Sequence, residues 1–156
     1  MKTHGYITTD QPPTSAEYIA LRCKVGWDSV ELSTAQNSLN SSLFTTTVRL
    51  DGKLIGMARV VGDGFMYFYI QDVIVDPAHQ GCGIGHVVMT RVEAYLAKAC
   101  TTGATVGLLA AKGKELFYRR YGFIERDGTE LGKGMCRFTK NSPASRSMLR
   151  LGKPSN

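Results

Sequence analysis

Residues 1–13 are mostly polar, with an edge strand expected near Tyr6 to Thr8, and a helical period of hydrophobic positions follows them. Thr14 or Ser15 can cap a helix, and Glu17 follows at close to the spacing of a capping box. This helix is expected to break at Gly26, and a second short helix is expected over residues 33–42. The apolar face predicted for the first helix consists of Ala16, Ile19, Ala20 and Cys23.

From residue 43 onward the pattern changes to one that is typical of strands. Strands are predicted over residues 44–50, 53–61 and 65–75, because β-branched and aromatic residues are frequent there. Asp51-Gly52 is a strong hairpin signal, and Gly62-Asp63-Gly64 predicts a second turn. The pattern therefore favours an antiparallel meander in the middle of the chain.

The second half of the chain alternates between helical and extended patterns. The expected elements are a helix from about Gly85, a strand over residues 105–110, a helix over 112–121, a strand from Phe123, and a last strand over 135–139. The first of these helices is clearly amphipathic. Its predicted apolar face consists of Val88, Val92, Tyr95, Leu96 and Ala99.

Length and composition favour one globular domain. The 156 residues are 43% hydrophobic and 21% charged, which is ordinary for a chain that buries a single core. We expect one domain over residues 1–140, followed by a basic C-terminal extension over 141–156. The N-terminus has no signal-peptide core and no segment approaches the length of a membrane span, so we expect a cytoplasmic protein without a membrane partner.

Charge and cysteine spacing narrow the choice of ligands. The formal net charge of +6 fits either a basic surface or an anionic cofactor. No compact basic stripe interleaved with aromatic residues is present, which argues against a nucleic-acid partner. The four cysteines are scattered, without the spacing of zinc ligands, so no metal site is expected.

The most informative stretch lies between the predicted strand that ends at Val75 and the helix that follows it. Gly81, Gly83 and Gly85 alternate, which leaves the backbone N–H groups uncovered by side chains. The beginning of a helix adds unpaired N–H donors. We therefore expect this loop to bind a phosphate or diphosphate. The residues Gly85-His86-Val87 supply neither the Gly-Lys-Ser/Thr of a Walker loop nor the last glycine of a dinucleotide fingerprint.

Two motifs give the chain a resemblance to the GNAT superfamily of N-acetyltransferases. Gln80-Gly81-Cys82-Gly83-Ile84-Gly85 is similar to the family's acyl-CoA loop, Q/R-x-x-G-x-G/A. Phe117-Tyr118-Arg119-Arg120-Tyr121-Gly122-Phe123 resembles its F-Y-x-x-x-G-F signature. The resemblance implies an α/β (α+β) fold, in which helices flank a mixed, mostly antiparallel sheet and splayed strands bind acyl-CoA. It also implies acetyl-CoA as the co-substrate.

The resemblance also assigns the cofactor contacts. The backbone of Val73 and Val75, on the fourth strand, is expected to pair with the pantetheine arm, and the Val73 N–H is the candidate donor to the thioester carbonyl. Such a donor would stabilise a developing oxyanion. The diphosphate contacts are expected at Gln80, Gly81, Cys82, Gly83, Ile84 and Gly85.

Tyr118 is the candidate general acid. A phenol, with a pKa near 10, stays protonated at neutral pH and can donate to a departing thiolate whose pKa is about 8.5. The alternative is a packed aromatic residue. Asp72, Gln71 and Tyr69 are candidates to receive the proton of the amine, and Asp72 is the only carboxylate among them. An ion pair or a turn cap is the alternative role for Asp72, and a water chain could replace a base. Asp72 and Gln71 face opposite ways unless a bulge intervenes.

The acceptor expected from the resemblance is a primary amine of a small molecule, which attacks the thioester directly through a tetrahedral intermediate. The expected substrate contacts are Trp27, Tyr69 and Gln71. Trp27, with Tyr67 and Tyr69, would suit an aromatic or apolar amine, although Trp27 could instead close the core. A protein or peptide acceptor and a non-enzymatic acyl-CoA-binding protein are the alternatives. Because dimers are common in the family, a homodimer is a further expectation.

Overall fold

The structure is a computed structural model that describes residues 5–139. The chain forms two compact units that divide between Leu108 and Leu109. Each unit is described by itself, and a single domain over residues 1–140 stays a prediction. The basic extension predicted over residues 141–156 lies outside the described residues.

The first unit is built on a five-stranded sheet in which the strands follow their order in the chain. The strands are β1 (Tyr6–Thr9), β2 (Phe44–Leu50), β3 (Lys53–Gly62), β4 (Tyr67–Val75) and β5 (Thr105–Gly107). The first four pair antiparallel, and β5 pairs parallel with β4. The mixed, mostly antiparallel sheet is therefore confirmed. The predicted hairpin turn is also present, because Asp51 and Gly52 both have positive φ angles, as a type I′ turn requires.

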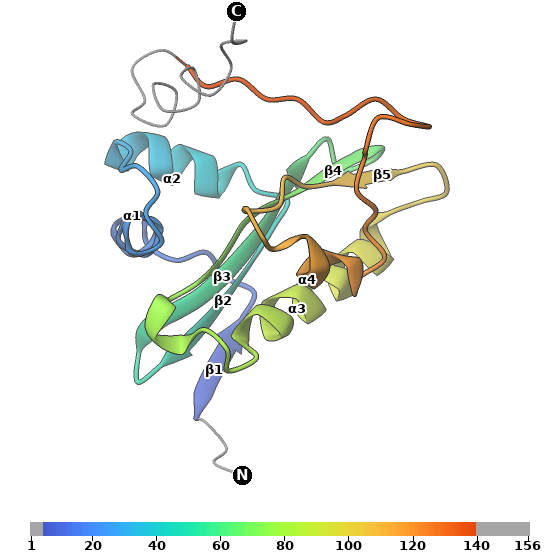
Figure 1. The fold of residues 1–156 in the computed structure, drawn as a ribbon. Helices are drawn as coiled ribbons and strands as arrows, with labels where there is room; N and C mark the ends of the chain where they lie inside the picture. The colour runs from blue at the N-terminus through green and yellow to red at the C-terminus, as the bar shows by residue number, and fades with distance from the viewer. Residues whose placement is uncertain (1–4, 140–156) are drawn as a thin grey trace, which may run out of the picture. The chain divides into compact units, whose positions relative to one another are not determined.

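Helices cover both faces of this sheet (Figure 1). They are α1 (Ser15–Lys24), α2 (Leu32–Asn40) and α3 (Ile84–Ala99), with a short 3₁₀ turn, η1 (Pro77–His79). Met57 of β3 and Ile74 of β4 pack in one core cluster with α1 and α2. On the other face α3 lies close to β3, because a Cβ at Gly56 would come within 2.6 Å of Ile84 Cγ2. Gly56 thus lets α3 approach the sheet.

Helix α1 begins as predicted but presents another face to the core. Its capping box is complete: Glu17 N donates to Thr14 Oγ1 at 3.2 Å, and Thr14 N donates to Glu17 Oε2 at 2.9 Å. Tyr18 and Leu21 are the buried residues of this helix. The predicted face is wrong, since Ile19 is only partly buried and the others are exposed, namely Ala16, Ala20 and Cys23. A tyrosine can take the inward position because its hydroxyl finds a buried partner.

Glu17 also joins α1 to β2 through a bidentate ion pair. Arg49 Nη1 and Nη2 donate to the two carboxylate oxygens at 2.5 and 2.8 Å. The hydrogen bonds from Arg49 lower the pKa of Glu17 from 4.5 to about 2. Because the folded pKa lies below the unfolded value, this stabilisation is present above pH 4.5 and is lost as the pH falls toward 2.

We therefore expect Glu17→Gln to lower the free energy of unfolding by about 1 kcal/mol at pH 7, since the pair is partly exposed and solvent screens it. The difference from the unsubstituted protein should vanish as the pH falls through that window. Urea unfolding at several pH values measures it, with the exposed Glu31→Gln as the control. A difference that stays constant down to pH 2 would contradict the assignment.

The second unit contains less regular structure than predicted. Helix α4 covers Glu115–Arg119 only, and no strand forms among its described residues, 109–139. The strands expected from Phe123 and over residues 135–139 are therefore wrong for this part of the chain. Several apolar side chains of these segments are exposed, such as Ile124 at 80% and Met135 at 93%. A strand needs a neighbour for its backbone hydrogen bonds, and the alternating pattern alone does not provide one.

Candidate acetyl-transfer site

Strand β4 loses one of its neighbours halfway along its length. Its parallel pairing with β5 ends at Tyr69 and Gly107, where β5 itself ends, whereas β4 continues to Val75. The strand predicted to reach residue 110 is therefore shorter, and β5 does not cover the second half of β4 (Figure 1). Val73 and Val75 lie on this part of β4, and their contact with a cofactor stays a prediction.

A bulge interrupts the pairing of β4 with β3 at the same place. The register pairs Ile74 with Met57 and Gln71 with Arg59, so two residues of β4, Asp72-Val73, oppose one residue of β3. Asp72 has a φ of +55°, a left-handed conformation that few residues other than glycine adopt. The bulge brings the side chains of Gln71 and Asp72 together, and Gln71 Nε2 donates to Asp72 Oδ1 at 3.1 Å.

Asp72 is the centre of a buried charge cluster. Its side chain is 0% exposed. The Oδ2 atom accepts hydrogen bonds from Tyr18 Oη and Arg59 Nε, both at 2.6 Å, and the Oδ1 atom accepts from Arg22 Nη1 at 3.3 Å. Of the alternatives for Asp72, this geometry matches the ion pair and not the general base, since an amine has no access to an enclosed carboxylate.

Two of the residues that bond to Asp72, Tyr18 and Arg59, were not predicted from the sequence. Burial, and next the hydrogen bond to Asp72, raise the pKa of Tyr18, which keeps its hydroxyl a neutral donor. Arg59 interrupts the apolar run of β3 just as Asp72 interrupts that of β4. Two opposite charges in two apolar strands that pair with each other are the signal that could have identified this cluster.

Trp27 lies next to the charge cluster. Its ring is partly buried against the core formed by α1 and α2, and the Arg22 guanidinium carbon lies 5.2 Å from the ring centroid. The core-closing role considered for Trp27 is therefore observed. Tyr69 and Gln71, the other predicted acceptor contacts, are partly buried on β4. A chain of contacts thus connects Gln71 to Trp27 through Asp72 and Arg22.

The turn after β4 is held from both sides. Asp76 Oδ1 accepts from Ala78 N at 3.0 Å and so caps η1, while Lys24 Nζ of α1 donates to Asp76 Oδ2 at 2.5 Å. Gln80 Nε2 donates back to Val75 O at 3.1 Å. These contacts connect the glycine loop directly to the uncovered end of β4.

The glycine loop itself presents bare backbone. Gly81 and Gly83 have φ angles of +75° and +83°, and a Cβ at either position would meet nothing within 4 Å. Cys82 between them is exposed, whereas the Ile84 side chain is 4% exposed and belongs to the core. Of the predicted loop residues, Ile84 can therefore offer a ligand only its backbone.

Helix α3 begins directly behind this loop and leaves its first N–H groups available. Gly83 is the N-cap, no side chain caps the helix, and its first turn carries no acidic residue. The first N–H groups of a helix have no partner within the helix and carry the positive end of its dipole. An anion that reaches the open loop would find these donors, so the residues present fit a diphosphate.

Tyr118 lies in the second unit, on α4. Its ring packs edge-on against Phe117 and Phe123, with centroid distances of 5.0 and 6.3 Å. Burial raises the pKa of Tyr118 to about 12. The phenol therefore stays protonated across the physiological range, as a donor must. Its proximity to Val73 in the first unit stays a prediction.

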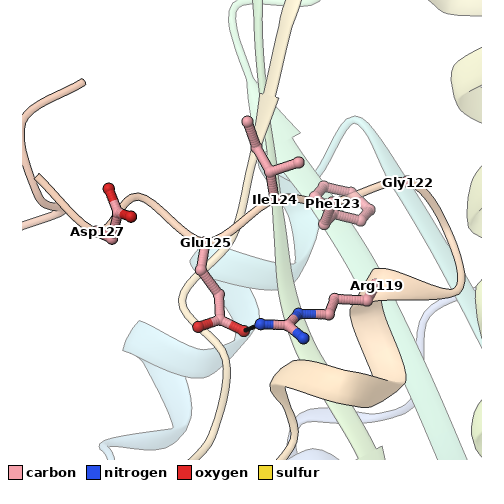
Figure 2. Close-up of a pocket in the computed structure, with 6 residues that line it drawn as sticks. All are labelled: Arg119, Gly122, Phe123, Ile124, Glu125 and Asp127. Carbon is pink, nitrogen blue, oxygen red and sulfur yellow. Dashed lines mark ion pairs between the residues drawn. The ribbon is translucent and has the colours of Figure 1, made fainter. Parts of the chain in front are cut away.

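The second unit also contains an open hollow of about 480 Å³ (Figure 2). Arg119 and Glu125 point toward each other across it, with 2.5 Å between Nη2 and Oε1. The lining residues are Arg119, Gly122, Phe123, Ile124, Glu125 and Asp127. None of them is a predicted site residue, so we do not assign this hollow to the reaction.

Residues 5–139 contain neither a metal-like cluster nor a membrane-length helix. No group of three or more His, Cys, Asp or Glu side chains in this range could hold a metal ion. No helix within it is long and apolar enough to cross a membrane.

Comparison with known proteins identifies the family. A family model described as an acetyltransferase (GNAT) domain matches residues 42–125, which include the whole opening of β4 and the glycine loop. The chain belongs to the GNAT family of acetyltransferases. The expected fold class and the expected enzyme class, an N-acetyltransferase, are thereby confirmed.

Curated relatives of this GNAT chain are N-acetyltransferases and a histone acetyltransferase. The uncharacterized N-acetyltransferase ycf52 of Pyropia yezoensis is 31% identical over 83% of this chain and 75% of its own length. Serotonin N-acetyltransferase 2, chloroplastic, of Oryza sativa is 36% identical over 46% of this chain and 35% of its own length. Histone acetyltransferase TAP1 of Glycine max is 32% identical over 67% of this chain and 49% of its own length.

Solved structures have the same fold. A probable acetyltransferase of unknown function from Staphylococcus aureus is 29% identical, with a TM-score of 0.78 over 85% of this chain and 99% of its own. A GNAT acetyltransferase from Brucella melitensis, solved in complex with acetyl-CoA, has a TM-score of 0.57 at 20% identity, over 88% of this chain and 97% of its own. The second likeness concerns the fold alone.

Proposed function

We propose that this GNAT enzyme transfers the acetyl group of acetyl-CoA to the primary amine of a small molecule by direct attack. The observation that carries the proposal is the juxtaposition of two features in the first unit. The pairing of β4 with β5 ends at Tyr69, and the open glycine loop with the beginning of α3 follows the end of β4 after one short turn.

The residues of this strand and loop would bind the co-substrate, which supplies an acetyl thioester. Backbone N–H groups from Gln80 to Gly85 would hold the diphosphate, and the backbone of Val73 and Val75 would pair with the pantetheine arm. The Val73 N–H would donate to the thioester carbonyl oxygen. One such donor contributes about 3 kcal/mol of transition-state stabilisation.

Tyr118 would donate a hydrogen bond to the departing sulfur. With its pKa raised to about 12, the phenol is a weaker acid than a thiol, whose pKa is about 8.5. Full proton transfer from Tyr118 is therefore uphill, and stabilisation of the thiolate by a hydrogen bond is the role that its chemistry supports best.

The amine must lose a proton before it attacks, because an alkylamine has a pKa of about 10.4. Asp72 is enclosed and ion-paired, so we propose that water carries this proton away. Gln71 and Tyr69 are partly buried and remain the polar groups of β4 that could orient such a water or the acceptor.

We propose an arylalkylamine as the acceptor. Trp27 and Tyr69 supply aromatic surface suited to an arylalkylamine, and the relative from Oryza sativa carries the name of a serotonin N-acetyltransferase. A protein acceptor is the second candidate, because the relative from Glycine max is named a histone acetyltransferase.

We propose a cytoplasmic location, with a plastid as the alternative because two relatives are named chloroplastic. A homodimer also stays a proposal.

An amine panel tests this choice. We expect acetyl-CoA to be consumed with arylalkylamines at a kcat/KM at least about tenfold above that for lysine-containing peptides, since one well-placed apolar contact is worth 1–3 kcal/mol. Release of free CoA measures the reaction, with acetyl-CoA and enzyme without amine as the control. A preference for the peptides would contradict the small-molecule acceptor and favour the protein acceptor.

A further inference from the structure

The bulge in β4 requires support from side chains. Asp72 has a positive φ angle that L-amino acids rarely adopt, and the neighbouring pairing with β3 is shifted. Such a conformation persists only where its surroundings determine it. The bulge also lies on the half of β4 that β5 does not cover, so no strand supports it from that side.

The support comes from the Asp72 carboxylate. Tyr18 Oη and Arg59 Nε both donate to Oδ2 at 2.6 Å, and this oxygen lies in a fully enclosed side chain. Arg22 Nη1 and Gln71 Nε2 donate to Oδ1. The residue of β4 with the left-handed backbone is therefore held by four hydrogen bonds to its carboxylate oxygens.

This cluster connects both helices of one face to β4. Tyr18 and Arg22 lie on α1, and their side chains reach Asp72. Arg59 Nη1 donates to Ser38 O at 3.0 Å and to Ser42 Oγ at 3.2 Å, so α2 and the residues that follow it hold the guanidinium. A shift of either helix would therefore be transmitted to the bulge.

We propose that Tyr18 and Arg59 are positioning residues, which act through the Asp72 carboxylate to hold the bulged backbone of Asp72-Val73 in the conformation that acetyl transfer requires. The inference rests on the proposed function, in which the Val73 N–H faces the thioester carbonyl. It gives Asp72 the role of an anchor for the strand and not of a proton acceptor.

The test compares two variants that each loosen α1. Tyr18→Phe removes only the hydroxyl that donates to Asp72, whereas Arg49→Gln breaks the ion pair between α1 and β2, away from the bulge. We expect Tyr18→Phe to lower kcat about tenfold, because a small misplacement of reacting groups is costly, with KM for acetyl-CoA changed less than about twofold. In Arg49→Gln, kcat should stay within about twofold, although both variants lower the melting temperature.

NMR of the backbone amides in the bulge gives a readout that does not depend on activity. The amide signals of Asp72 and Val73 should broaden through microsecond-to-millisecond exchange in Tyr18→Phe and stay sharp in Arg49→Gln, because only the first variant releases the bulge. Equal loss of kcat in the two variants, or equally sharp Asp72 and Val73 signals in Tyr18→Phe, would overturn the proposal.

Asp72→Asn separates the anchor from a base, because asparagine tolerates the left-handed conformation and fills the same space. We expect kcat to fall while the inflections in the pH profile of kcat/KM stay where they are in the unsubstituted enzyme. Loss of an inflection would overturn the proposal. If the unsubstituted protein neither binds acetyl-CoA nor releases CoA, the proposed function fails, and the amide signals of Asp72 and Val73 still decide whether Tyr18 holds the bulge.

Discussion

Replacing Gly83 by valine is expected to lower the affinity for acetyl-CoA by at least about 100-fold. Gly83 has a φ of +83° and is the N-cap of α3, a conformation that a β-branched residue adopts only with strain. The loop would turn away, and its N–H groups would no longer point at the diphosphate. Loss of two hydrogen bonds to a charged group, each worth about 1.5–3 kcal/mol, accounts for this factor. Isothermal titration calorimetry with acetyl-CoA measures it.

Gly103→Val is the matched control for this experiment. Gly103 has a similar φ of +92° and equally open surroundings, but it lies in the turn before β5 and not in the glycine loop. Both substitutions should lower the melting temperature, whereas only Gly83→Val should lower the affinity. An equal loss of affinity in both variants would mean that backbone strain, and not the loop, determines binding.

The second large effect is expected from Tyr118→Phe. The phenylalanine ring keeps the packing against Phe117 and Phe123 and loses only the hydroxyl. We expect kcat to fall about 100-fold, the low end for loss of one hydrogen-bond donor to a developing anion. KM for acetyl-CoA should change little, because the hydroxyl acts on the sulfur as the C–S bond breaks. Single-turnover release of CoA, at a pH where chemistry limits the rate, measures this effect.

Tyr121→Phe is the control, since Tyr121 also packs edge-on against Phe117, at 5.5 Å, but is not assigned a role in the reaction. Its kcat should stay within about twofold of the unsubstituted enzyme. Because the pKa of Tyr118 is raised to about 12, the unsubstituted enzyme should show no alkaline loss of activity from this residue below pH 11. A loss of less than about threefold in Tyr118→Phe would contradict its role.

Local chemistry made several elements predictable from the sequence. The capping box of Thr14 and Glu17, the Asp51-Gly52 turn and the glycine loop before α3 each depend on residues close together in the chain. The mistaken face of α1 has a different origin. From the sequence alone, the polar hydroxyl of Tyr18 predicts a position at the surface. Its buried partner, Asp72, lies 54 positions away in the chain, so the helix itself gives no sign of it.

Partners that are distant in the sequence also explain why the sequence alone did not decide between a base and an ion pair for Asp72. Considered within β4 alone, Asp72 is a lone carboxylate beside the reaction centre, which favours a base. Tyr18 and Arg59, which enclose it, come from α1 and β3, so only the pairing of the strands and the docking of α1 make it an anchor. The strands predicted from Phe123 and over 135–139 do not form. An alternation of apolar and polar residues shows that a segment could be a strand, but it does not show that a neighbouring strand is present to pair with it.

The most direct test of the account is a crystal structure of the enzyme in complex with CoA. The account predicts that the diphosphate accepts hydrogen bonds from backbone N–H groups between Gln80 and Gly85, that the pantetheine arm lies along Val73 and Val75, and that Tyr118 Oη donates to the sulfur. A diphosphate bound away from the glycine loop, or a Tyr118 hydroxyl beyond reach of the sulfur, would contradict it.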